Sequence, residues 1–293
     1  MKNEYIGGGI TATGKLWEEA LYDAGNNAIT AQFDGRGAIS RYAVMNKYEV
    51  FSKFYTLLTI DSVPLDYMRE KRAEMIGKRQ TTTVYADGAE IEIVQFLDGK
   101  NNCIYVQYGV TAERDMDFEA VMNFGINYQS YVDQLPGARL SAGNLLRIIG
   151  GFLGGKKQEQ EKDGKALILR GKVMGDFYLD AALSEGGKMG EADRGFFNQF
   201  AVGGKVKKGE KRIFRYVISA GTRGDYTFSD VAERLKNFDK ALKEAQEYID
   251  SLVCPAGITD PMEQTYYKSL LNCSLSNYKE LGKFKGFLAG IVY

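Results

Sequence analysis

Residues 81–96 have the sequence TTTVYADGAEIEIVQF, and this stretch decides the fold. Two runs rich in Thr, Val, Ile, Tyr and Phe lie on either side of Ala86-Asp87-Gly88. β-branched and aromatic side chains suit a pleated, half-buried surface, and Asp-Gly supplies the positive φ angles that a tight hairpin requires. The sequence therefore predicts an antiparallel hairpin with strands at 81–85 and 90–96.

The same design recurs along the chain up to about residue 225. Ile29, Ala31 and Phe33 alternate with polar residues before a turn at 34–37, and the polar segment 98–102 leads into another strand-like run. A single sheet cannot carry ten or more strands without curling or splitting into two layers. We therefore expect a mainly β fold, a large antiparallel two-sheet sandwich followed by C-terminal helices. Further strands are expected at 103–110, 118–128, 166–172, 177–183, 196–202 and 212–219, and the charged segment 156–163 is expected to be a solvated connection.

After Gly224 the period of the apolar residues changes from two to steps of three and four. This spacing places one apolar stripe along a helix from Ser229 to Val253, with Thr227 to Asp230 as its capping box. The residues expected to be buried are Val231, Leu235, Phe238, Leu242 and Ile249.

A second helix is expected after Asp260, which is a suitable N-cap followed by Pro261 at the first helical position. Gly282 is expected to end this helix. The glycine-aromatic segment 284–293 would then form a loop.

The charge balance disfavours a polyanionic partner, because Lys plus Arg and Asp plus Glu number 38 each. The chain contains no histidine, so the commonest general base and metal ligand is missing. The three cysteines have no metal-ligand or disulfide spacing and are expected to be buried core residues. No catalytic, cofactor-binding or metal-binding residue is assigned.

Neither the first residues nor the longest apolar run, 145–155, has the pattern of a signal peptide or a membrane span. We therefore expect a cytoplasmic protein without a membrane or nucleic-acid partner.

The order of sandwich, linker helix and further helix resembles the N-terminal part of glucoamylase-like and glycogen-debranching-like glycoside hydrolases and phosphorylases. These enzymes place a super-sandwich before an (α/α)6 barrel. The likeness is carried by the strand 212–221, the linker helix 229–253 and the segment 267–281. It implies a sandwich domain at 1–225, a helical linker at 226–258 and the first helix and loop of a truncated barrel at 259–293.

The resemblance implies a non-catalytic role that supports the barrel and shapes the sugar site. Glycoside hydrolysis needs two opposed carboxylates, and in these enzymes both come from later barrel loops. The implied partners are a carbohydrate, the C-terminal barrel domain of the same protein, which the chain lacks, and a second copy in a homodimer.

The aromatic residues Phe287, Tyr293 and Trp17 are the candidate sugar contacts, because aromatic rings stack on the apolar faces of pyranoses. Core or interdomain packing is the favoured interpretation for Trp17. The alternative function is a stand-alone sugar-binding or assembly module. A row of exposed aromatic residues on one sheet face would favour that module, whereas an apolar patch at the C-terminal end would favour the barrel-supporting role.

Overall fold

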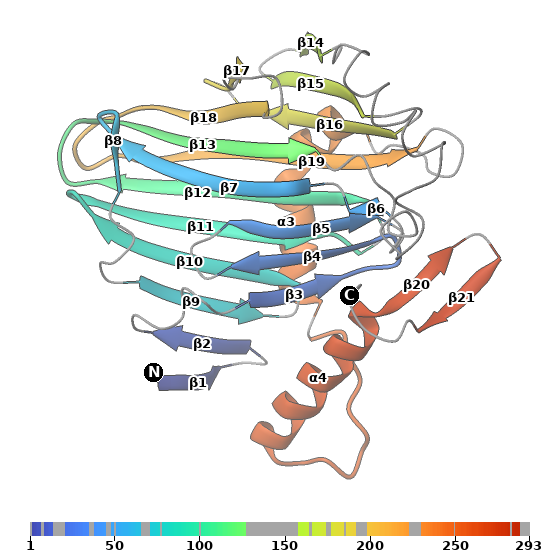
Figure 1. Cartoon of the computed structure of the whole chain (residues 1–293). Helices are drawn as coiled ribbons and strands as arrows, with labels where there is room; N and C mark the ends of the chain where they lie inside the picture. The colour runs from blue at the N-terminus through green and yellow to red at the C-terminus, as the bar shows by residue number, and fades with distance from the viewer. Residues whose placement is uncertain are drawn as a thin grey trace.

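The fold is an antiparallel β-sandwich with helices on one outer face and a C-terminal helix and hairpin at one end (Figure 1). The computed structural model describes residues 2–6, 9–13, 21–34, 38–44, 48–49, 51–65, 71–76, 78–99, 101–126, 158–163, 166–173, 177–184, 186–191, 198–222, 230–248, 250–281 and 283–287. The predicted mainly β sandwich followed by C-terminal helices is confirmed.

One layer is a ten-stranded sheet in which every pair of neighbouring strands is antiparallel. Most neighbours are sequential hairpins, and β12 pairs with the distant β19. The strands, in spatial order, are β1 (Lys2–Ile6), β2 (Gly9–Thr13), β9 (Lys71–Ile76), β10 (Arg79–Ala86), β11 (Ala89–Leu97), β12 (Cys103–Ala112), β19 (Lys211–Thr222), β16 (Phe177–Leu183), β15 (Ala166–Val173) and β14 (Gln158–Asp163).

The other layer consists of two smaller sheets rather than one, and β5 of one sheet lies beside β7 of the other (Figure 1). A buried apolar core joins the two layers and includes Phe33, Ile93, Tyr108 and Phe118. The five-stranded sheet contains β17 (Lys188–Glu191), β18 (Asn198–Val206), β13 (Met116–Ile126), β7 (Phe51–Ile60) and β8 (Val63–Pro64), and the four-stranded sheet contains β3 (Leu21–Gly25), β4 (Ile29–Asp34), β5 (Ile39–Val44) and β6 (Tyr48–Glu49).

The hairpin predicted within residues 81–96 is present as β10 and β11. Its register runs from Arg79 opposite Phe96 to Ala86 opposite Ala89. The two turn residues, Asp87 and Gly88, have φ angles of 53° and 77°. These positive values match the turn that the Asp-Gly pair predicts.

The charged segment was wrongly expected to be a solvated connection. Residues Gln158–Asp163 form β14, the last strand at one edge of the ten-stranded sheet, paired with β15. An edge strand pairs on one side only, so it does not need the apolar alternation of a central strand. Charged residues at an edge also discourage pairing with other chains.

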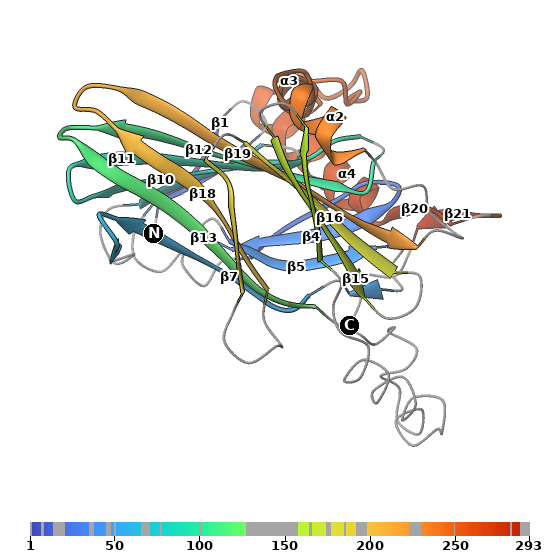
Figure 2. The same ribbon diagram turned by 90° about the horizontal axis from the view of Figure 1, so that it is seen from above.

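The linker is two helices, α2 (Val231–Lys236) and α3 (Phe238–Glu247), on the outer face of the ten-stranded sheet (Figure 2). Asp230 caps α2 by accepting hydrogen bonds from the amides of Ala232 and Glu233. The helix was predicted to continue to Val253, but α3 ends at Glu247. Ser251 donates through Oγ to the carbonyl of Tyr248 at 2.6 Å, and such local bonds compete with helical ones.

The apolar stripe of this linker faces the sheet as expected, although not uniformly. Val231 and Phe238 are buried, whereas Leu235 and Leu242 are half-buried. The side chain of Ile249 lies outside the described residues. The ring of Phe238 meets those of Phe96 at 5.3 Å and Tyr105 at 5.6 Å, both edge to face.

The C-terminal part contains α4 (Pro261–Ser276) and a hairpin of β20 (Tyr278–Leu281) and β21 (Phe284–Phe287). Asp260 caps α4 as predicted, accepting from the amides of Met262 and Glu263. The expected helix stop at Gly282 and loop from 284 are wrong. The helix ends at Ser276, because Tyr278 to Leu281 pairs with Phe284 to Phe287 across a short turn.

The cysteine prediction holds for one residue. Cys103 is buried in the cluster beneath the linker helices, whereas Cys254 is half-buried. The side chain of Cys273 lies outside the described residues.

Replacing Phe238 by Ala should destabilise the protein by about 3–5 kcal/mol, because the ring is fully buried between two aromatic neighbours. Urea unfolding measures the change. Lys240→Ala, at an exposed position on the same helix, is the control and should stay within about 0.5 kcal/mol. A loss below about 1 kcal/mol for Phe238→Ala would contradict the packing described.

Candidate functional site

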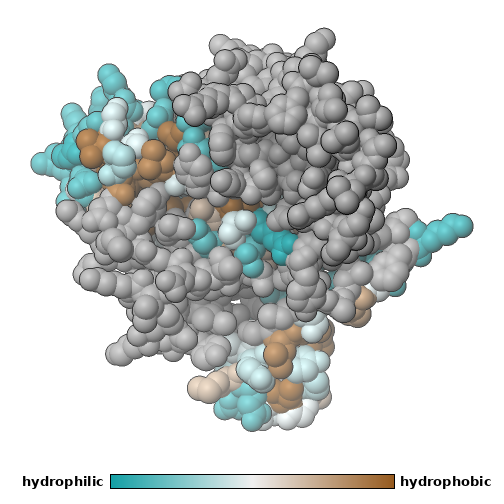
Figure 3. Space-filling view, in the orientation of Figure 1, coloured by the Kyte–Doolittle hydropathy of each residue, from teal (hydrophilic) through white to brown (hydrophobic). Residues whose placement is uncertain are grey.

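Large apolar side chains remain exposed on and around α4 (Figure 3). Met262, Tyr266 and Leu270 are 72%, 59% and 50% exposed, and their spacing of four residues places them in one stripe along the helix. Val253 and Phe287 are also exposed. We call these five residues the C-terminal apolar face.

The stripe is uncovered because α4 contacts the sandwich mainly through its C-terminal end. Among the α4 residues whose side chains are described, Asn272 and Ser276 are buried. There the helix approaches β3 so closely that a side chain on Gly25 would collide with the backbone of Ser276. The N-terminal half of α4 extends away from the sheets (Figure 1).

A buried polar network, which we call the junction, attaches this C-terminal part to the sandwich. Its members are Asn26, Lys78, Asp98, Asn101, Tyr105, Arg234, Tyr248 and Lys279. The Asn26 amide donates through Nδ2 to the carbonyls of Asp98 at 3.0 Å and Asn101 at 2.7 Å. Its Oδ1 accepts from the amides of Ala28 at 2.8 Å and Ile29 at 2.9 Å. One side chain therefore joins the β3–β4 turn to the β11–β12 turn.

The carboxylate of Asp98 is enclosed by donors. It accepts from the amide and from Nδ2 of Asn101, at 2.7 and 2.5 Å, and from the hydroxyl of Tyr105 at 3.0 Å. Burial, followed by the charge of Asp98, raises the pKa of Tyr105. Arg234 of α2 donates through Nη2 to Asn101 Oδ1 at 3.2 Å, which attaches the linker helix to the same turn.

Two lysines lie in the junction. Lys78 is 6% exposed, and its Nζ lies 4.4 Å from the centre of the Tyr248 ring. Lys279 is 0% exposed and donates through Nζ to the carbonyls of Ser276 at 2.6 Å and Tyr278 at 3.3 Å.

Backbone hydrogen bonds attach the segments that carry these lysines to their neighbours in the sandwich. The amide of Leu97 donates to the carbonyl of Lys78, and the amide of Glu280 donates to the carbonyl of Asn27 at 3.2 Å. Burial lowers the pKa of each lysine to about 8. Asp98 partly opposes this for Lys78, whereas the charge of Lys78 lowers the pKa of Lys279 further.

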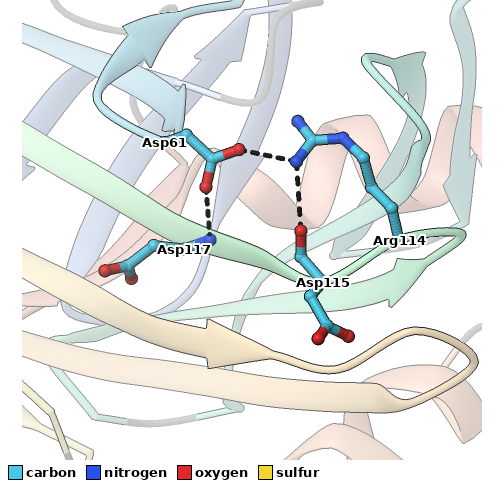
Figure 4. Close-up of polar contacts among 4 residues, drawn as sticks. All are labelled: Asp61, Arg114, Asp115 and Asp117. Carbon is cyan, nitrogen blue, oxygen red and sulfur yellow. Dashed lines mark hydrogen bonds and ion pairs between the residues drawn. The ribbon is translucent and has the colours of Figure 1, made fainter.

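A second polar cluster lies at the other end of the sandwich, near β8 (Figure 4). Asp61 accepts from Arg114 Nη1 at 2.6 Å and from the amide of Asp117 at 2.9 Å. The bond from Asp117, followed by that from Arg114, lowers the pKa of Asp61. These side chains are exposed and stabilise turns. Within the described part of the chain, no group of three or more acidic or cysteine side chains could hold a metal ion.

Of the three predicted sugar contacts, the structure describes one, Phe287. Phe287 lies on β21, 62% exposed, with its ring 5.5 Å from that of Tyr278. Trp17 and Tyr293 lie outside the described residues. The junction was missed, since Asn26 and Asp98 resemble ordinary turn residues and Lys78 and Lys279 resemble surface residues.

The exposed aromatic residues do not form a row on the ten-stranded sheet in the part of the chain that is described. The exposed large apolar residues there are Tyr85 on β10 and Ile213 on β19, which are separated by two strands. None of the described helices is long and apolar enough to cross a membrane.

No protein-family model and no curated protein sequence matches the chain. Among solved structures, a bacterial glucoamylase complexed with acarbose is similar with a TM-score of 0.52 and 14% identity, over 90% of this chain and 41% of that one. A protein described as a kojibiose phosphorylase from the human microbiome is similar with a TM-score of 0.44 and 10% identity. The match covers 94% of this chain and 39% of that one. The galactose mutarotase related enzyme from Lactobacillus acidophilus is similar with a TM-score of 0.39 and 9% identity. The match covers 71% of this chain and 99% of that one.

The chain thus spans about two fifths of the length of the glucoamylase and phosphorylase structures. At these identities the likeness to the glucoamylase concerns the fold.

The lowered pKa values of the two junction lysines predict that the free energy of unfolding rises with pH between 7 and 9.5. The folded pKa values of about 8 lie below the ordinary lysine value of 10.5, so the unfolded chain binds more protons in this window. The expected gain is about 2 kcal/mol for each lysine. Above about pH 10 the raised pKa values of Tyr105 and Tyr248 act in the opposite direction.

Urea unfolding at pH 7.0 and 9.5 measures this effect. Lys78→Met should stabilise the protein at pH 7.0 and reduce the pH dependence, whereas the exposed Lys240→Met should change neither. A wild-type stability that falls over this range would contradict the burial of the two ammonium groups.

Proposed function

We propose that the chain is the N-terminal, non-catalytic part of a carbohydrate-active enzyme, a glycoside hydrolase or phosphorylase acting on an oligosaccharide or glucan. Residues 1–225 form its sandwich domain, residues 226–258 its linker, and residues 259–293 the first helix and hairpin of a helical domain. The sandwich supports that domain and shapes one side of its sugar site. The glucoamylase likeness, which covers 90% of this chain, supports this arrangement.

The observation that carries the proposal is the C-terminal apolar face. A helix that packs only against the sandwich would normally have polar residues on its other faces, since an apolar stripe exposed to water costs free energy. Met262, Tyr266 and Leu270 instead lie in the pattern with which a helix packs on another helix. The proposed occupant is the following helices of the same protein, and a homodimer contact is the second possibility.

Within this arrangement Phe287, Tyr293 and Trp17 are the proposed sugar contacts. Phe287 supports the idea most directly, because its ring is exposed on the hairpin that follows α4. Aromatic rings at such positions stack on the apolar faces of sugars.

The alternative, a stand-alone sugar-binding or assembly module, has weaker support. Its expected mark was a row of aromatic residues on one sheet face. In the described ranges, five of the eight exposed large apolar residues lie between Val253 and Phe287 instead. This distribution favours the barrel-supporting role.

The proposal predicts that the apolar stripe matters only when further helices are present. Leu270→Ser and Tyr266→Ser should change the stability of the 293-residue chain by less than about 0.5 kcal/mol, and that of the longer protein by about 2–4 kcal/mol. The control is Ile213→Ser, which removes a comparably exposed side chain from the sheet. Equally small effects in both proteins would contradict the proposal, and a chain that dimerises through Leu270 would support the homodimer instead.

The 293-residue chain should not cleave or phosphorolyse glucosides, because the two opposed carboxylates belong to the proposed helical domain. The assay uses an aryl α-glucoside and maltooligosaccharides, each with and without phosphate. Turnover that copurifies with the chain and persists in preparations from different expression hosts would refute the non-catalytic assignment.

A further inference from the structure

One face of the β20–β21 hairpin points away from the sandwich. Residues directly opposite each other in an antiparallel pair share a face, and the register places Tyr278 opposite Phe287 and Glu280 opposite Lys285. The intervening Lys279 belongs to the other face and is buried. The hairpin projects from the end of the molecule in both ribbon views (Figure 1, Figure 2). We call Tyr278, Glu280, Lys285 and Phe287 the hairpin face.

The aromatic pair of the hairpin face offers an apolar surface that is already held in place. The rings of Tyr278 and Phe287 meet edge to face, with their centres 5.5 Å apart and 68° between their planes. Tyr278 is half-buried, whereas Phe287 is 62% exposed. An exposed ring that a neighbour already restricts loses little side-chain entropy when a pyranose stacks on it.

A carboxylate and an ammonium group lie beside these rings. Glu280 accepts through Oε1 from the hydroxyl of Tyr278 at 3.3 Å, and its Oε2 lies 3.8 Å from Nζ of Lys285. Both charged side chains are exposed, and such ion pairs are weak. A carboxylate accepts several hydrogen bonds and an ammonium group donates three, so both groups have capacity left for sugar hydroxyls.

The charges on the hairpin face balance, which bears on the kind of sugar that it suits. Lys285 already has Glu280 as its counter-ion, and Lys283 lies in the turn, at the opposite end of the hairpin from the aromatic pair. An acidic sugar therefore gains little from Lys285 and is repelled by Glu280. A neutral sugar meets no such repulsion.

We propose that the hairpin face binds one neutral pyranose unit of an oligosaccharide, which stacks on the ring of Phe287 and hydrogen-bonds to Glu280 and Lys285. This inference rests on the proposed function, in which Phe287 is a sugar contact. It adds Glu280 and Lys285 as the residues that select a neutral sugar over an acidic one.

The test follows the amide resonances of residues 278–287 in the 293-residue chain during a titration with maltotriose. Saturable shifts of these resonances are expected. Phe287→Leu keeps an apolar side chain on β21 but removes the ring, and it should weaken the affinity at least tenfold. The control is Tyr85→Leu, which removes an exposed ring from β10 and should bind as the wild type does.

Trigalacturonate in place of maltotriose tests the preference for a neutral sugar. It should bind the wild type at least tenfold more weakly than maltotriose does. Glu280→Gln leaves Lys285 without its counter-ion, so this variant should bind trigalacturonate more tightly and maltotriose more weakly than the wild type. Changes in opposite directions cannot come from a loss of folded hairpin, which would weaken both.

Three results would overturn the proposal: hairpin resonances that do not respond to maltotriose, an unchanged affinity in Phe287→Leu, or trigalacturonate binding as tight as that of maltotriose. Each of them leaves the proposed function standing, because the stabilities of Leu270→Ser and Tyr266→Ser test that function without any sugar.

Discussion

The amide of Asn26 is the contact on which the placement of the C-terminal part depends. Its four hydrogen bonds join the turn between β3 and β4 to the turn between β11 and β12. One turn belongs to the smaller layer and the other to the ten-stranded sheet. Because the amide is buried, losing any of these partners would leave a polar group unsatisfied, which is costly.

Two of the elements around this contact are hydrogen-bonded to the same turns. Arg234 connects α2 to Asn101, and Glu280 connects β20 to Asn27. Tyr42 adds a second bond between layers, since its hydroxyl donates to the carbonyl of Asn102 and accepts from the amide of Ala220. The orientation of α4, and with it the apolar face, therefore follows from turns at one end of the sandwich. The opposite end, where Asp61 and Arg114 meet, stabilises turns only.

Local sequence predicted most of the fold and little of the junction. The Asp87-Gly88 hairpin and the cap at Asp260 depend on neighbouring residues, so their patterns suffice. The N-cap of α2 is Asp230, whereas the sequence predicted a capping box from Thr227 to Asp230 for a helix from Ser229. β14 was missed because edge pairing leaves no apolar alternation, and the early end of α4 was missed because a downstream hairpin competes with the helix. Lys78 and Lys279 lie 201 positions apart, and nothing near either one predicts that tertiary contacts bury both.

The central claim is that α4 presents an apolar face for further helices of the same protein. Hydrogen exchange of the amides of residues 261–276 tests it directly. The account predicts weak protection of the N-terminal half of α4 in the dilute 293-residue chain and strong protection in the longer protein, because only packing of the apolar stripe would prevent local opening. Strong protection of the whole helix in the dilute chain would mean that α4 is already fully packed, and would contradict the claim.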